Sequence, residues 1–231
     1  MWPIPALKNE FVCIFFSSDT IACGWIQKST TNSASLILRA YQRYALDNFE
    51  SVHLIPFNPT KIRKYISSFL YEHNLHNAFV TFCLDGIMEH YIALPTSTPV
   101  RTDFNMPTTS DMQWEYRYVY SDHEGNHIFY VYAVAQSLML QYKLLAMGGE
   151  CNLIRIAPKA VALLDAYKNI FGVAYRKSQL AVDMMQHDNN IQELMSRDAV
   201  RRMVSFSSDF AQDDSVIAAM CGMFCAERMP L

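Results

Sequence analysis

The first third of the chain alternates short apolar runs with polar turns. Residues 11–16 and 21–27 are two such runs, and Ser-Ser-Asp-Thr at 17–20 joins them. Polar residues between two apolar runs are typical of a β-hairpin. A third apolar run at 34–44 follows the polar stretch 28–33, so the pattern predicts three consecutive strands.

A helix and a fourth strand are predicted next. Asn58 and Pro59 suit the N-cap and the first position of a helix. Apolar residues behind them recur at helical spacing over 60–74, and the apolar run 78–84 predicts a strand. Strand–strand–strand–helix–strand is the opening of a ribonuclease-H-like α/β fold, so we expect a mixed sheet covered by helices.

The middle of the chain predicts a smaller unit that is rich in strands. Residues 87–94 have a strand pattern, and a stretch rich in proline and threonine follows at 95–110. Alternating residues at 114–120 and an apolar run at 127–135 are joined by the polar residues 121–126, which predicts a hairpin.

The chain then returns to helix and strand signals. Periodic apolar residues predict a helix at 136–147, which Gly148 and Gly149 end. A strand at 151–157 leads into a helix that begins at Pro158. A last helix is predicted at 215–228.

Residues 178–206 carry two incompatible patterns. Single-sequence rules allow a helix that runs through Met195. Three strands, at 178–185, 190–196 and 200–206, fit the pattern equally well. Periodicity alone does not choose between them.

Composition and charge narrow the classes of function. Of the 231 residues, 51% are hydrophobic and 18% are charged, and the formal net charge is -3. This balance is typical of a packed globular protein rather than a disordered chain. No polybasic run offers a footprint for a phosphate backbone, so we expect no nucleic acid as a ligand.

The cysteines and the first residues indicate a reducing compartment. Most of the six cysteines lie inside apolar runs, as buried free cysteines do. The N-terminus lacks the pattern of a secretory signal, and no apolar run reaches the roughly 18 residues of a membrane span. We therefore expect a cytoplasmic protein without disulfides.

Motifs for catalysis or for cofactors are missing from the sequence. Loops that cradle phosphates need glycine at a strand-to-helix turn, and none of the seven glycines lies in such a turn. No Gly-x-Ser-x-Gly is present, and no cysteine or histidine has the neighbours of a catalytic or zinc site. We expect no catalytic residue, no cofactor and no metal, and hence no enzyme.

A valine-rich strand, a helix, Gly148, a second strand and an alanine-rich helix follow one another over residues 127–171. This order resembles the PilM family, actin-like proteins of type IV pilus assembly to which HofM and the cytoplasmic part of GspL are related. Further segments similar to the family are 61–74, 77–86, 87–95, 180–183, which resembles a Val-Asp-Ile-Gly strand, and 196–199, which resembles an Arg-Asp-Gly hairpin turn.

The resemblance implies a division of the chain into three parts. Residues 1–85 correspond to actin-like subdomain 1A, and 86–148 to an inserted small α/β subdomain, 1C. Residues 149–231 then hold the rest of 1A and a reduced subdomain 2A, with 178–206 in strands.

The chain departs from that family where ATP should bind. Residues 15–19 read Phe-Phe-Ser-Ser-Asp in place of the family's Asp-Ile-Gly-Ser phosphate loop. In the second loop Asp183 is kept, but Met184 and Met185 stand where glycine should leave space for phosphate. The adenosine-contacting subdomain, 2B, has no room between Phe206 and the last helix, so the resemblance is to a shortened and degenerate member.

The resemblance implies a pseudo-ATPase scaffold rather than an enzyme. In the family, the groove between 1A and 1C grips a short N-terminal peptide of PilN, a single-span inner-membrane protein. We expect a PilN-like cytoplasmic tail as partner, no nucleotide turnover, and a place peripheral to the inner membrane through that partner only. Tyr91 and Tyr132 are the expected groove anchors, because their strands border the first sheet. A residual ATP-binding, ATPase or kinase-like enzyme is the alternative, and an unrelated α/β protein is the third hypothesis.

Overall fold

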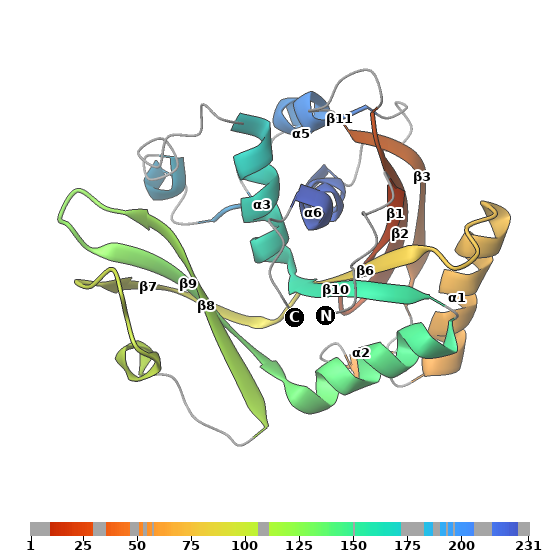
Figure 1. Cartoon of the computed structure of the whole chain (residues 1–231), viewed down its shortest axis with the longest axis horizontal. Helices are drawn as coiled ribbons and strands as arrows, with labels where there is room; N and C mark the ends of the chain where they lie inside the picture. Colours follow the sequence, from red (N-terminus) through yellow and green to blue (C-terminus); the bar gives the residue numbers. More distant parts are fainter. Residues whose placement is uncertain are drawn as a thin grey trace, which may run out of the picture.

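Two β-sheets of different size lie next to each other in the computed structural model of the chain (Figure 1). The structure describes residues 10–29, 36–46, 51–52, 55–56, 58–105, 111–149, 151–171, 183–186, 190–192, 194–195, 197–205 and 214–225. Among the described helices, none has the length and the hydropathy of a transmembrane segment.

The larger sheet has six strands in the order β10-β6-β1-β2-β3-β11. They are β1 (Glu10–Phe16), β2 (Thr20–Lys28), β3 (Leu36–Ala45), β6 (Phe79–Leu84), β10 (Asn152–Pro158) and β11 (Val204–Ser205). β1, β6 and β10 run parallel, whereas β2 is antiparallel to both of its neighbours, and β11 is parallel to β3. A short ribbon of β4 (Ser51–Val52) and β5 (Ile55–Pro56) is separate from this sheet. The mixed sheet expected from the sequence is therefore confirmed.

Helices cover both faces of the six-stranded sheet. α1 (Pro59–Glu72) and α2 (Gln136–Gly148) lie on one face, and α3 (Lys159–Phe171), α5 (Arg197–Met203) and α6 (Asp214–Cys225) lie on the other (Figure 1). Successive strand residues point to opposite faces. The ring of Phe16 therefore meets Tyr142 of α2 at 4.9 Å, while Phe11 stacks on Phe224 of α6 at 5.1 Å.

The smaller sheet is inserted between β6 and α2. Its antiparallel strands β7 (Met88–Leu94), β8 (Met112–Ser121) and β9 (His127–Ala135) are in the order β7-β9-β8, and a single 3-10 turn, η1 (Arg101–Phe104), lies between β7 and β8. One face of β9 joins the main core through Tyr130 and Tyr132. The other face packs Phe129 and Val131 on Phe104 in a small core of its own.

Local sequence signals set several element boundaries correctly. Asn58 is the N-cap of α1, where its side-chain oxygen accepts a hydrogen bond from the Lys61 amide at 3.1 Å, and Pro59 begins the helix. The hairpin of β8 and β9 forms where the sequence predicts it. The predicted order of strands and helices is confirmed as far as α3.

The expectation of strands over 178–206 is wrong for most of the described residues. Residues 178–182 lie outside the described part, and 183–186 are helical rather than extended. Residues 190–192 and 194–195 form no strand. Only β11 is extended.

The hairpin turn expected at 196–199 is replaced by the start of α5. Ser196 lies outside the described residues, and α5 runs from Arg197 to Met203. Its sequence, Arg-Asp-Ala-Val-Arg-Arg-Met, is rich in helix formers. Val200 and Met203 are both buried and lie one turn apart, so a helix buries them on one face.

α2 packs on the six-stranded sheet, although the sequence analysis grouped residues 136–148 with the insertion. The ring of Tyr142 lies 4.9 Å from Phe16 of β1 and 5.8 Å from Phe82 of β6. The strands of the inserted sheet themselves span 88–135.

Candidate functional site

The carboxyl ends of β1, β6 and β10 meet at one edge of the larger sheet, where ligands of open α/β sheets usually bind. The turn after β1 is closed on itself. The Ser17 amide donates to the Thr20 carbonyl at 2.9 Å, and the Ser17 hydroxyl donates to Asp19 Oδ1 at 2.7 Å. The Ser17 amide is therefore committed to the turn, and the turn contains no glycine that would open it to an anion.

A nearly buried lysine sits at the same edge. Lys159, at the start of α3, is 8% exposed, and its ammonium lies 5.6 Å above the ring of Phe15. Its Nζ donates to Asp85 Oδ2 and to Gln192 Oε1, both at 3.1 Å. The Asp85 carboxylate therefore balances the positive charge of Lys159, which could otherwise attract a phosphate.

Asp183, the aspartate expected in the second phosphate loop, lies in a helical segment. It accepts a short hydrogen bond from the Tyr167 hydroxyl of α3. Met184 beside it is fully buried. No group of three or more His, Cys, Asp or Glu side chains that could hold a metal ion occurs in the described ranges.

A hollow, here called the junction pocket, lies where the two sheets and α2 meet. Its volume is about 60 Å³. Side chains from the carboxyl ends of β6 and β10, from β8 and β9, and from α2 line it; they are Leu84, Ile87, Gln113, Glu115, Tyr132, Val134, Met139, Ile156, Ala157 and Pro158. A space this small takes a single side chain rather than a nucleotide, since drug-sized ligands occupy roughly 300–1,000 Å³.

Tyr132, one of the two expected groove residues, lines the junction pocket. It is 8% exposed, and its hydroxyl donates a short hydrogen bond to Glu115 Oε2 across the strand pair. Burial, together with the Glu115 carboxylate that accepts this bond, raises the pKa of Tyr132 well above its usual range. The phenol therefore stays protonated and fixes the carboxylate at the pocket wall.

Tyr91 is close to Tyr132 but does not line the junction pocket. It lies opposite Tyr130 in the pairing of β7 with β9, with the two rings 5.3 Å apart. Tyr130 in turn lies 5.5 Å from Tyr132. The three tyrosines form one row on the face of the insertion that joins the main core, and Tyr91 is the member farther from the pocket.

Charged residues that the sequence analysis missed tie the insertion to the main sheet. Asp165 of α3 is 6% exposed and pairs with Arg117 of β8 at 2.7 Å and with Arg155 of β10 at 3.1 Å. Arg155 also donates to the Met223 carbonyl of α6 at 3.3 Å. No local pattern could have joined these positions, because they lie on four separate elements.

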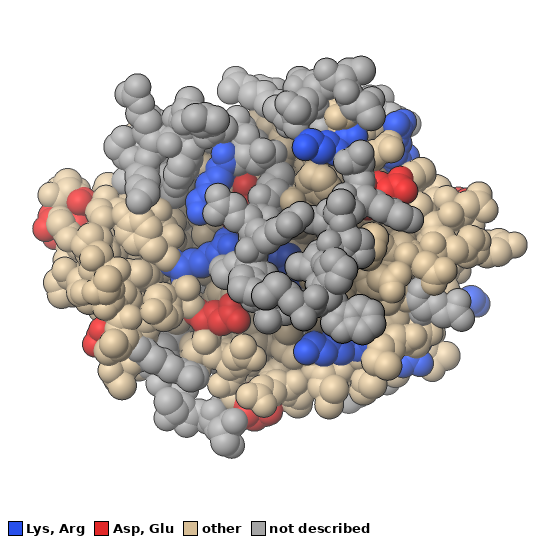
Figure 2. All heavy atoms as spheres, in the orientation of Figure 1, with Lys and Arg blue, Asp and Glu red and all other residues tan. Residues whose placement is uncertain are grey.

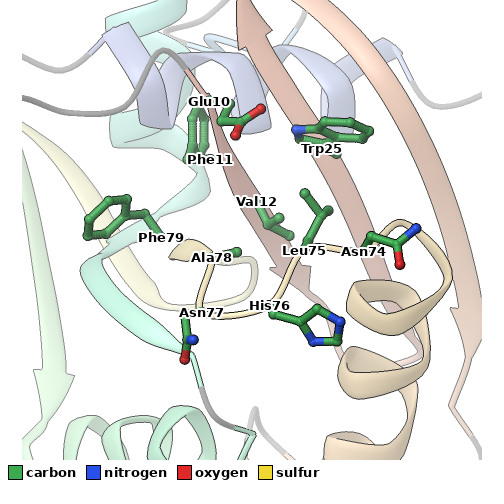
Figure 3. A pocket seen from close by; sticks show the side chains of 10 residues that line it. All are labelled: Glu10, Phe11, Val12, Trp25, Asn74, Leu75, His76, Asn77, Ala78 and Phe79. Carbon is green, nitrogen blue, oxygen red and sulfur yellow. The ribbon is translucent and has the colours of Figure 1, made fainter.

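A second hollow, here called the amino-end pocket, lies at the opposite edge of the larger sheet and has a volume of about 180 Å³. Figure 3 shows Glu10 and Trp25 above it and residues 74–78 of the α1–β6 loop below. Trp25 Nε1 is buried without a hydrogen-bond partner in the described part of the chain. This pocket is the second place at which a peptide side chain can be tested.

Comparisons with known proteins find similarity in structure but not in sequence. The sequence matches no protein-family model and no curated protein. In structure, the chain is similar to a chain of the PilM-PilN type IV pilus biogenesis complex, with a TM-score of 0.53 and 13% sequence identity over 71% of this chain. The chain has the actin-like fold of PilM. The match covers 51% of that chain, so this protein spans about half of its length.

Two more distant likenesses have TM-scores below 0.5. One is a protein from Bacteroides thetaiotaomicron with an actin-like ATPase fold and unknown function, at a TM-score of 0.39 and 11% identity, covering 73% of this chain and 59% of that one. The other is the cytoplasmic domain of EpsL, an inner membrane component of the type II secretion system of Vibrio cholerae, at 0.37 and 13%, covering 66% and 57%.

In sequence, residues 206–213 separate β11 from α6, and the smaller sheet is inserted between β6 and α2.

Proposed function

We propose that this chain is a scaffold of a type IV pilus or related secretion machine, which binds the cytoplasmic tail of an inner-membrane partner without turning over nucleotide. The junction pocket carries the proposal, because it combines a small apolar cavity with a fixed carboxylate between the two sheets. The PilM fold and the PilM-PilN complex support it. In this proposal the protein is cytoplasmic and peripheral to the inner membrane.

The chemistry of the pocket fits an extended tail with an apolar and a basic residue. β10 is the edge strand of the larger sheet, and its residues 156–158 line the pocket. An edge strand can pair with an added peptide strand through backbone hydrogen bonds. The pocket then takes an apolar side chain, while Glu115 attracts a basic one.

A second candidate function is a residual nucleotide-binding enzyme. Asp85 and Lys159 favour it, because a carboxylate and an ammonium at the carboxyl edge of parallel strands are groups that could hold magnesium and phosphate. Against it stand the pairing of these two charges with each other and the closed turn at Ser17.

Peptide binding tests the first function. The probe is a fluorescently labelled peptide with the cytoplasmic tail of a PilN protein, titrated with this chain. Tyr132→Ala should weaken binding by roughly 1–3 kcal/mol, about tenfold or more. Glu115→Gln should weaken it with less disturbance of the core, because the glutamine has the same shape. Tyr71→Ala is the matched control, since Tyr71 is 77% exposed on α1.

Two results would sink this assignment. One is full-affinity binding by folded Tyr132→Ala and Glu115→Gln proteins. The other is loss of binding in Trp25→Ala alone, which would move the peptide to the amino-end pocket. Tyr91→Ala should have the smaller effect of the two tyrosine variants, because Tyr91 lies outside the pocket lining.

Calorimetry with ATP and magnesium separates the two functions. We expect no binding tighter than about 100 μM, which corresponds to about -5.5 kcal/mol. Tighter binding that Lys159→Met removes would favour the residual enzyme instead.

A further inference from the structure

Helix α2 has an apolar surface on both of its sides. Tyr142, Leu145 and Ala146 face the larger sheet and are almost completely buried. On the opposite side, Leu140, Leu144 and Met147 are 57%, 49% and 74% exposed. These last three residues, at spacings of four and three, form one continuous row, here called the α2 stripe.

Such a row differs from the usual outer face of a surface helix. Helices that cover a sheet normally turn charged or polar residues to water. Single exposed apolar residues need no explanation, whereas a contiguous apolar row marks an interaction site. The other large apolar residues with similar exposure among those described, such as Tyr71, Val100 and Tyr116, do not form a row along one helix.

Cations flank the α2 stripe on both sides. Lys143 is exposed on α2, three residues after Leu140 and four before Met147, so it lies beside the stripe. On the other flank, Arg63 of α1 donates to the Leu144 carbonyl at 3.3 Å and packs against Gly148. Lys64 beside it is exposed.

Among the described residues, few acidic side chains lie near the stripe; the exposed Asp111, which accepts a hydrogen bond from Ser137 in the first turn of α2 at 2.8 Å, is one of them. α2 contains no Asp or Glu, and the one acidic residue of α1, Glu72, lies at its far end. Figure 2 shows Lys and Arg atoms at the lower right, where α1 and the C-terminal half of α2 lie, and Asp or Glu atoms at the bottom, near the start of α2. The chain as a whole is nevertheless acidic, so this local excess of cations is a property of one face.

We propose that the α2 stripe docks directly on an anionic lipid surface. An apolar row between cations is the pattern of a helix that lies in the interface plane of a membrane. Leu140, Leu144 and Met147 would enter the boundary of the acyl chains, while Lys143, Arg63 and Lys64 would meet lipid phosphates. A convex row of three side chains is far smaller than the 20–30 residues that a stable protein interface takes from each side.

The α2 stripe lies next to the junction pocket, but the proposed lipid contact does not depend on that pocket. Met139, which lines the pocket, is the neighbour of Leu140 in the stripe. A protein docked through α2 therefore holds the pocket close to the lipid surface. A tail that emerges from the bilayer gains about 3.3 Å of reach per extended residue, so a short tail can then enter the pocket.

Co-sedimentation with vesicles tests the proposal. The full chain should bind vesicles of phosphatidylcholine with about a third of phosphatidylglycerol, and should bind pure phosphatidylcholine weakly. The triple variant Leu140→Ser, Leu144→Ser, Met147→Ser should lose binding by about tenfold or more. Lys143→Glu should weaken it by about fivefold or more, because each cation near an anionic surface contributes roughly that factor.

Matched variants make the result specific. Lys168→Glu changes the net charge equally on α3, at the opposite face of the sheet, and should leave vesicle binding unchanged. Val100→Ser removes an equally exposed apolar side chain from the insertion and should do the same. Melting curves should show that all variants stay folded, since every substituted side chain is about half exposed or more, or carries an exposed charge.

Three outcomes would overturn the proposal. The first is equal binding to anionic and neutral vesicles or to neither. The second is a triple variant that binds anionic vesicles as well as the wild type. The third is a wild-type protein that self-associates through the stripe, seen as a smaller particle for the triple variant in light scattering with no change in vesicle binding.

Discussion

In the β1–β2 turn, one hydroxyl group provides a hydrogen bond to a neighbouring carboxylate. In this turn the Ser17 hydroxyl donates to Asp19 Oδ1 at 2.7 Å. That hydrogen bond is the main cause that holds the pKa of Asp19 below its usual range, and Thr20 and Arg43 add to it. The carboxylate is thus hydrogen-bonded within its own turn.

Removing this hydroxyl gives a prediction for acid. Ser17→Ala should raise the pKa of Asp19 toward its ordinary value, because the charged form loses its hydrogen bond. A lowered folded pKa contributes stability above the unfolded pKa, and this contribution is lost as the pH falls through the folded pKa. The variant should therefore be less stable than wild type at neutral pH, and the difference should vanish in acid.

The measurement is a titration of the Asp19 side-chain carbons by NMR, together with urea unfolding at neutral and acidic pH. Ser17→Thr keeps a hydroxyl and should leave the pKa of Asp19 lowered. An unchanged Asp19 titration in Ser17→Ala would show that the hydroxyl does not control this carboxylate.

At the scale of elements, the parts predicted well have strong local signals. The cap at Asn58 and the polar turn between β8 and β9 are written in neighbouring residues, and both elements form as expected. α5 was missed because its seven residues are too few for a clear period, and burial of Val200 and Met203 decides its conformation.

The candidate site was predictable only in part, for a similar reason. Tyr132 could be chosen because its strand borders the first sheet. Its partner Glu115 depends on the register of β8 with β9, and that register shifts between Tyr118 and Tyr120. A shift of one residue turns side chains to the other face, so sequence alone could not place Glu115 beside Tyr132.

The packing of α3 on α6 carries a prediction at this scale. A Cβ on Gly222 would lie 1.7 Å from the Ala162 carbonyl oxygen, which is backbone and cannot move alone. Gly222→Ala should therefore push α6 off α3 and destabilise the fold by about 3 kcal/mol or more.

Gly24→Ala is the matched control, because its Cβ would meet the flexible Met220 sulfur at 2.7 Å. Unfolding in urea should show a clearly larger loss for Gly222→Ala than for Gly24→Ala. Equal losses would contradict the prediction that the close backbone contact at Gly222 is the costlier one.

At the scale of the whole molecule, one carboxylate joins the two sheets. Asp165 binds Arg117 of the insertion and Arg155 of the larger sheet, so the junction pocket lies between units that share a buried ion pair. Breaking such a pair by removing one partner leaves the other charges buried without compensation.

Asp165→Asn should therefore destabilise the protein by about 3 kcal/mol, at the low end for buried pairs because both arginines keep some exposure. Unfolding in urea gives the loss, and limited proteolysis should show faster cleavage next to the insertion. Glu124→Gln, at an exposed hairpin tip, should change stability by less than about 0.5 kcal/mol. A loss of that small size for Asp165→Asn would mean that the insertion is held by apolar contacts alone.

The cover that α6 gives to the first strands has a consequence for synthesis on the ribosome. β1 and β2 are translated long before α6, but the face on which Phe11 and Gly24 lie is closed by Phe224 and Met220 of α6. At about 5–20 residues per second, translation leaves this face bare for on the order of ten seconds or more. We expect a chaperone to bind the nascent hairpin during this time. A chain that stops before α6 leaves this face of β1 and β2 uncovered.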